Sequence, residues 1–185
     1  MGHFAIQNRV VYRGGGNVTD HELAEIYERN VNIVYKICYI YLKNKADTED
    51  AVQSVFLKMA QSPVNFNSYE HEKAWLITTA RNHCKDQLKS WWKRKRVDFE
   101  NLPEIAAWDE KNETKEMIGK LFTLSEKYRV VLYLYYFEDY STKEIAELLG
   151  RNESTIRTQL VRGRERLKHD LGGTRFGQRD CQQNI

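Results

Sequence analysis

The chain has 185 residues, 41% of them apolar, and a formal net charge of +3. This length suffices for one medium domain or two small ones with compact cores. No apolar run reaches eighteen residues and no charged-then-apolar leader is present, so we expect neither membrane insertion nor secretion, and a cytoplasmic location.

Charge is strongly segregated along the sequence. Residues 81–96 contain seven Lys or Arg and one Asp, whereas residues 98–116 contain seven Asp or Glu and two Lys. Residues 151–168 are basic again, with six Lys or Arg and two Glu. This pattern of basic, acidic and basic segments indicates two cationic surfaces separated by an acidic connection.

Helical periodicity begins after an N-terminal extension, residues 1–18, which ends in a glycine-rich breaker. Thr19 and Glu22 form a Thr-x-x-Glu capping box, and apolar spacing of three and four then continues to Tyr41. The segment KADTEDAVQSVFLKMAQ predicts a second helix, for which Asp47 or Thr48 is a possible cap, and Pro63 ends it.

A third helix is predicted after the polar connector VNFNSYEHE, in the segment KAWLITTARNHCKDQLKSWWKRKR. Residues 97–117 are acidic, contain Pro103 and lack sustained periodicity, so we expect a linker there. The apolar segment YRVVLYLYYF is compatible with a buried strand. A helix is favoured because Ser125 can cap it and no partner strand is evident.

Two short helices in close succession predict a helix-turn-helix near the C-terminus. Ser141 and Glu144 form a second capping box before IAELLG, Gly150 is suited to a left-handed helix end, and Asn152 or Ser154 begins the next helix. In TIRTQLVRGRERL the apolar residues Ile156, Leu160 and Leu167 fall on one side together with Gly163, which allows another backbone to approach closely.

The opposite side of this last helix has the composition of a DNA-reading surface. It carries Thr155, Thr158, Val161 and Arg162, flanked by Arg157, Gln159 and Arg166. Arg can bond guanine bidentately, and Thr or Val can contact a thymine methyl group in the major groove. A solvated helix whose arginines pair with Glu153 and Glu165 is the alternative. The preceding helix and tight turn favour DNA binding.

The segment LSEKYRVVLYLYYFEDYSTKEIAELLGRNESTIRTQLVRGRERLK resembles the C-terminal promoter-recognition region of bacterial sigma factors. Upstream, DTEDAVQSVFLKM resembles the family's polymerase-docking segment, and KAWLITTARNHCKDQLKSWWKRKR resembles its minus-ten-reading segment. With only these two regions, the chain is similar to the extracytoplasmic-function (ECF) group of the sigma-70 family. The resemblance implies an all-α fold of two small helical domains, the second containing the helix-turn-helix.

The resemblance implies a domain order and three sets of functional residues. Region 2 would span residues 19–96, the acidic linker 97–117, region 4 residues 118–172, and a tail 173–185. Minus-thirty-five recognition would fall to Thr155, Arg157, Thr158, Val161, Arg162 and Arg166. Minus-ten recognition would involve Tyr69, Asn82, Lys85, Lys89 and Lys93, and polymerase docking Asp50, Gln53 and Phe56. Tyr69 and Phe66 are the stacking candidates, with core packing as the alternative for both.

The expected partners are core RNA polymerase and promoter DNA, and the group implies a cognate anti-sigma factor. One or two bidentate contacts, each about 1–3 kcal/mol, are too few to locate a promoter, so a second reader is needed. Two duplex turns separate the two elements by about 70 Å, whereas the nineteen residues 98–116 of the acidic linker average about 24 Å as free coil. Polymerase must therefore set the spacing.

Two other functional classes compete with this interpretation. No metalloprotease, nucleophile-elbow or phosphate-loop motif occurs, so we expect no enzyme, catalytic residue or cofactor. Cys38, Cys84 and Cys181 have no C-x-x-C spacing, which predicts neither a zinc site nor a disulfide framework. A stand-alone helix-turn-helix repressor or activator is the stronger rival, although no ligand pocket or phosphoacceptor pattern accompanies the helices.

Overall fold

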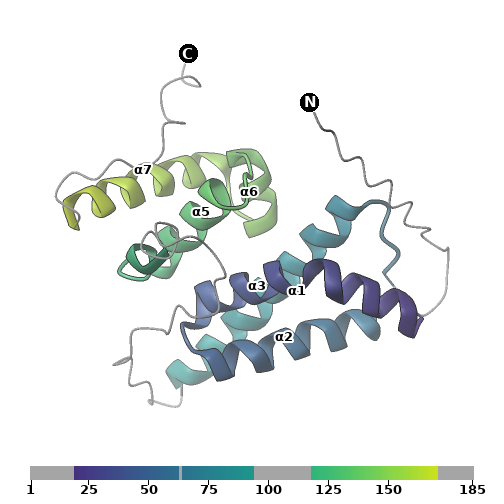
Figure 1. The fold of residues 1–185 in the computed structure, drawn as a ribbon. Coiled ribbons are helices and arrows are strands. Elements are labelled where there is room, and N and C mark those ends of the chain that lie inside the picture. Colours follow the sequence, from purple (N-terminus) through teal and green to yellow (C-terminus); the bar gives the residue numbers. More distant parts are fainter. Residues whose placement is uncertain (1–18, 63, 94–117, 171–185) are drawn as a thin grey trace, which may run out of the picture.

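Helices are the regular elements in the part of the chain that the computed structural model describes, namely residues 19–62, 64–93 and 118–170 (Figure 1). The side chains of residues 91–93 and 169–170 lie outside this description. The labelled helices are α1 (Asp20–Leu42), α2 (Lys45–Ala60), α3 (Tyr69–Lys93), α5 (Glu126–Tyr136), α6 (Thr142–Leu149) and α7 (Glu153–Asp170). The predicted all-α fold is confirmed. The predicted linker at 97–117 and the terminal segments fall outside the described residues.

Two predicted capping boxes form as expected. Thr19 Oγ1 accepts a hydrogen bond from the Glu22 amide at 3.3 Å, and the Thr19 amide donates to the Glu22 carboxylate at 2.9 Å. Ser141 and Glu144 repeat this arrangement at 3.3 and 2.8 Å. Each box satisfies amide groups that the first helical turn leaves without partners, so the starts of α1 and α6 follow from local sequence.

The predicted cap of α2 is wrong, and the predicted cap of α5 is correct in position only. α2 begins at Lys45, before both predicted caps. Asn44 takes the cap position, and its side chain accepts a hydrogen bond from the Asp47 amide at 3.1 Å. Ser125 occupies the cap position of α5 but makes no side-chain capping bond. α7 begins at Glu153, so of the two predicted starts Asn152 is correct.

α1, α2 and α3 pack into a three-helix bundle whose apolar stripes meet at its centre. The buried set includes Val34, Ile37, Cys38, Ala51, Val55, Leu76, Ala80 and Cys84. Cys38 and Cys84 are free thiols in this core, and no group of three metal-ligating side chains occurs among the described residues. Burial of apolar surface at about 25 cal/mol per Å² is the main source of this bundle's stability.

α5 is the centre of the second group of helices, with α6 and α7 packed against it (Figure 1). Its residues Tyr128–Leu134 are all buried. This central segment of α5 therefore has no exposed face, which explains why its sequence resembles a buried strand. A β-carbon on Gly163 of α7 would lie 2.9 Å from Leu132 Cδ1. The close neighbour of this glycine is thus a side chain of α5 and not the backbone that we expected.

The two groups of helices contact each other directly, which the sequence did not indicate. The buried guanidinium of Arg129 on α5 donates from Nε to the Ile40 carbonyl of α1 at 2.6 Å and from an Nη to the Leu124 carbonyl at 2.9 Å. Lys43 Nζ donates to the Phe122 carbonyl at 2.9 Å. On α3, Arg81 donates to the Leu148 carbonyl of α6 at 2.9 Å.

We expect Lys43 to make stability rise between about pH 8 and 10. Burial, and then the positive charge of Arg129, lower the pKa of Lys43 from 10.5 to about 8 in the folded chain. Within this window the unfolded chain binds the proton that the folded chain has released, so raising the pH favours folding. Urea unfolding of the wild type and of Lys43→Met at several pH values measures this. A stability difference that stays constant from pH 7.5 to 10 would contradict the prediction.

Candidate nucleic-acid and polymerase interfaces

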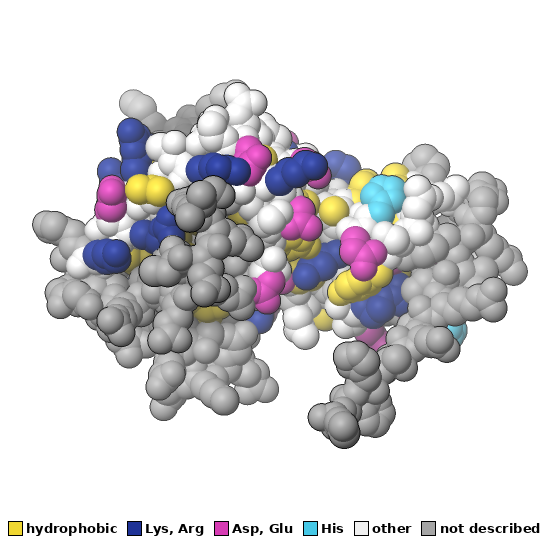
Figure 2. Space-filling view, turned by 90° about the horizontal axis from the view of Figure 1, so that it is seen from above, with side chains coloured by type: hydrophobic (Ala, Val, Ile, Leu, Met, Phe, Trp, Pro, Cys, Tyr) yellow, Lys and Arg dark blue, Asp and Glu magenta, His cyan; other side chains and the backbone are white. Residues whose placement is uncertain are grey.

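The outward face of α7 contains all six residues predicted to read DNA. Val161 is 46% exposed although it is apolar, and the other five are exposed as well: Thr155, Arg157, Thr158, Arg162 and Arg166. On the opposite face, Ile156, Leu160 and Leu167 are buried against the rest of the helical group. Figure 2 shows basic side chains, interspersed with acidic ones, over the side of the molecule where α7 lies in Figure 1.

The arginines of this face differ in how firmly the protein itself holds them. Arg157 donates to the Glu153 carboxylate at 2.9 Å, and the Thr142 hydroxyl and this arginine together lower the pKa of Glu153. Arg166 lies 4.8 Å from the ring centre of Tyr128. Arg162 makes no hydrogen bond or ion pair with any part of the chain that the structure describes. Arg162 is therefore the arginine most available to a ligand.

A shallow hollow of about 260 Å³ lies between the start of α5 and the outward face of α7. Its lining includes Thr155, Thr158 and Arg162, together with Lys127 and Tyr128 from α5. Sequence reasoning missed Lys127, because the packing that brings the start of α5 beside α7 leaves no local signal. Gln159 at the margin accepts from an Arg151 Nη at 3.0 Å. The hollow thus combines an ammonium, a guanidinium and hydroxyl groups.

The residues predicted to read the minus-ten element lie on α3. Tyr69 and Asn82 are exposed, and the Asn82 side-chain oxygen accepts from Arg81 Nε at 3.1 Å and from an Arg81 Nη at 2.7 Å. Lys89 is exposed and pairs with Asp86 at 3.1 Å, whereas Lys85 is partly buried, which lowers its pKa. The side chain of Lys93 lies outside the described part of the chain.

The loop between α2 and α3 is tied to the first turn of α3. The Asn67 amide donates to His71 Nδ1 at 3.3 Å, and the His71 amide donates to Ser68 Oγ at 3.2 Å. Phe66 is buried, with its ring centre 5.6 Å from His71 and 5.8 Å from Trp75. Of its two interpretations, core packing is therefore the observed one, and the exposed aromatic residue beside this loop is Tyr69.

The predicted docking residues on α2 divide by exposure. Asp50 and Gln53 are exposed, whereas Phe56 is only 6% exposed and its ring centre lies 4.7 Å from that of Tyr27. An apolar groove of about 470 Å³ runs beside this pair. Its lining includes Leu57, which is 60% exposed. Sequence reasoning missed Tyr27 and Leu57, although an exposed leucine outside the apolar stripe of α2 was a usable signal.

Comparison with known proteins assigns both groups of helices. The family model described as Sigma-70 region 2 matches residues 26–94, and the one described as Sigma-70, region 4 matches residues 120–167. The ECF RNA polymerase sigma factor SigM of Bacillus subtilis is 30% identical over 154 residues, which cover 78% of this chain and 91% of SigM. The chain belongs to the ECF sigma factors. SigL of Mycobacterium tuberculosis is also 30% identical to this sigma factor, over 81% of the chain and 90% of SigL.

A solved structure agrees with this fold. The sigma factor RpoE of Bartonella quintana, in complex with the anti-sigma factor NepR, superposes with a TM-score of 0.63 at 23% sequence identity. The match covers 84% of this chain and 97% of that one. The architecture of this sigma factor is therefore that of a known relative.

The comparisons confirm the predicted family and function. This sigma factor directs RNA polymerase to promoters, and its relatives are transcription initiation factors. The region 2 match contains most of α1 together with α2 and α3, and the region 4 match contains α5, α6 and most of α7. None of the described helices has the length and apolar character that a membrane span requires.

Proposed function

We propose that the outward face of α7 reads the minus-thirty-five element, that α3 and the loop before it read the melted minus-ten strand, and that α2 docks on core polymerase. The observation that supports this most is the two-sided character of α7, whose donors and methyl groups face solvent while Ile156, Leu160 and Leu167 are buried. A major groove accepts a helix with such a face, and an unstacked base can be held by an exposed amide and an aromatic ring.

The boundaries predicted from sequence remain part of this proposal. Region 2 would occupy residues 19–96, region 4 residues 118–172, and the acidic segment 97–117 would connect them. A cytoplasmic location follows from a role with core polymerase. A cognate anti-sigma factor is proposed by analogy with RpoE of Bartonella quintana, which was solved with NepR.

Simultaneous reading of both elements requires the two groups of helices to separate. Arg81 contacts α6 at 2.9 Å and the adjacent Asn82 at 2.7 Å, so the proposed minus-ten reader lies beside the helix-turn-helix. On promoter DNA, the two elements lie about 70 Å apart. We call the arrangement in which the two groups of helices contact each other the closed arrangement. It is therefore incompatible with binding both elements, and docking on polymerase would separate the two groups.

We expect Asp50→Lys to weaken binding to core polymerase by about tenfold or more, because it reverses a charge on the proposed docking face. Glu49→Lys is the matched control, since Glu49 is the neighbouring exposed carboxylate and the change in net charge is identical. Fluorescence anisotropy with purified core enzyme measures both. Equal losses for the two variants would contradict the assignment of this face.

Run-off transcription from a randomised promoter library with purified core enzyme, together with a gel shift of duplex promoter DNA with and without core enzyme, tests the function as a whole. We expect selected promoters with two conserved elements and no tight duplex binding by the chain alone. Tight sequence-specific binding by the chain without polymerase would favour the stand-alone repressor or activator.

A further inference from the structure

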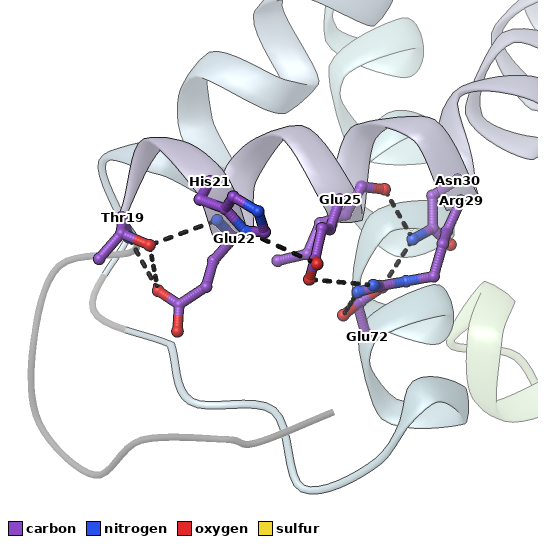
Figure 3. Close-up of polar contacts among 8 residues, drawn as sticks. Thr19, His21, Glu22, Glu25, Arg29, Asn30 and Glu72 are labelled. Carbon is purple, nitrogen blue, oxygen red and sulfur yellow. Dashed lines mark hydrogen bonds and ion pairs between the residues drawn. The ribbon is translucent and has the colours of Figure 1, made fainter. Parts of the chain in front are cut away.

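A buried polar cluster joins the start of α3 to α1, and the proposed contacts with DNA and polymerase do not account for it. The Glu72 carboxylate is fully buried. One oxygen accepts from Asn30 Nδ2 at 2.6 Å, and an Arg29 Nη approaches the two oxygens at 3.3 and 3.1 Å. Figure 3 shows Glu72 reaching from its helix toward Arg29 and Asn30 on the neighbouring α1.

The donors of this cluster are themselves held in place. Asn30 Nδ2 also donates to the Ile26 carbonyl at 3.0 Å, and Arg29 pairs with Glu25 at 3.8 Å. The carboxylate therefore meets donors whose directions are already set. Hydrogen bonds to a buried carboxylate are directional, unlike apolar contacts, so they specify one position of α3 along α1.

Stability alone is a poor explanation for the cluster. Asn30 Oδ1 and Arg29 Nε are buried without a hydrogen-bond partner in the described structure, so the network is only partly satisfied. Replacing a buried ion pair by apolar residues of similar volume is often neutral or stabilising. A partly satisfied network at this position is better explained by the geometry that it imposes.

The geometry in question is that of the loop before α3. Glu72 lies in the first turn of α3, three residues after Tyr69, and its amide donates to the Ser68 carbonyl at 3.1 Å. The bonds among Asn67, Ser68 and His71 then extend this connection back into the loop. A shift of α3 by one residue would move this loop by about 1.5 Å relative to α1.

We propose that Glu72 is a positioning residue for minus-ten recognition. Held by Arg29 and Asn30, it sets the position of α3 on α1 and thereby places the loop at 64–68 and Tyr69 against the unstacked base. The proposal rests on the proposed function, in which this loop and α3 read the melted strand. Glu72 itself does not contact DNA, because its side chain is fully buried.

The test compares holoenzymes assembled from core polymerase and full-length chains. A triple variant, Arg29→Met with Asn30→Leu and Glu72→Met, removes every charge of the cluster. The probes are four single-stranded nontemplate oligonucleotides. Each carries a different base at the minus-ten position that is selected most strongly from the randomised promoter library. We expect core binding to remain as in the wild type, while the discrimination between the best and worst base falls by about tenfold or more, as for other misplaced sites.

Two further variants keep the result interpretable. Glu72→Gln preserves the shape of the side chain and is expected to lose part of the discrimination, so it serves if the triple variant does not fold. Thr48→Val, another buried polar residue of the same bundle, is the control and should leave discrimination unchanged.

Opposite results would overturn this inference. Wild-type discrimination in a folded triple variant, or in Glu72→Gln where the triple variant does not fold, would show that the cluster is structural only. A wild-type holoenzyme with no preference among the four oligonucleotides would refute minus-ten reading by this loop, and with it the role of Glu72.

Discussion

Replacing Arg162 by alanine is expected to lower transcription from a promoter with an intact minus-thirty-five element by about tenfold. Arg162 lies on the exposed face of α7, lines the hollow beside α5 and is held by no hydrogen bond or ion pair among the described residues. Its guanidinium can therefore bond a base without first breaking a contact with the part of the chain that the structure describes. One bidentate base contact is worth about 1–3 kcal/mol.

Two variants separate base reading from a general loss of positive charge. Arg157→Ala should have a smaller effect, because Arg157 must exchange its 2.9 Å contact with Glu153 for any contact with DNA. Lys45→Ala removes an exposed charge from the proposed docking helix α2, so any loss that it causes should be the same on promoters with intact and with scrambled minus-thirty-five elements. The measurement is run-off transcription from promoters with intact and scrambled minus-thirty-five elements. An equal loss on both promoters would show that Arg162 contributes charge and not sequence recognition.

Replacing Arg129 by methionine is expected to lower the free energy of unfolding by about 2–4 kcal/mol. The Arg129 guanidinium is buried and donates to two main-chain carbonyls, those of Ile40 and Leu124. Methionine fills a similar volume but leaves both carbonyls without this donor, and each buried unpaired group costs about 1–3 kcal/mol. Burial of the charged Arg129 guanidinium itself costs desolvation free energy. The methionine variant does not have this cost, which offsets part of the loss.

Urea unfolding of the full chain measures the effect of Arg129. Lys127→Met is the control, because Lys127 is a basic residue of the same helix with an exposed side chain. The control should change stability by less than about 0.5 kcal/mol. If Arg129→Met unfolds at the same urea concentration as the control, the two hydrogen bonds do not stabilise the closed arrangement.

Local sequence signals were reliable where a few neighbouring residues complete a structure. The boxes at Thr19 and Ser141 each need one side chain three residues away, so the starts of α1 and α6 were predicted correctly. The outward face of α7 followed in the same way from the 100° rotation per residue. The start of α2 was missed because two acceptable caps competed with Asn44, and only the folded geometry selects among them.

The sequence by itself determined the helices, the exposed face of α7 and the family, because these depend on spacing and composition within short segments. Tertiary structure alone decided that Arg129 would reach Ile40, that Lys127 would join the face of α7, and that Glu72 would be buried against Arg29 and Asn30. The pairs formed by Arg129 and Glu72 lie 89 and 42 residues apart in the chain. No local pattern encodes such contacts, since they arise only when separate helices bury their apolar stripes against each other.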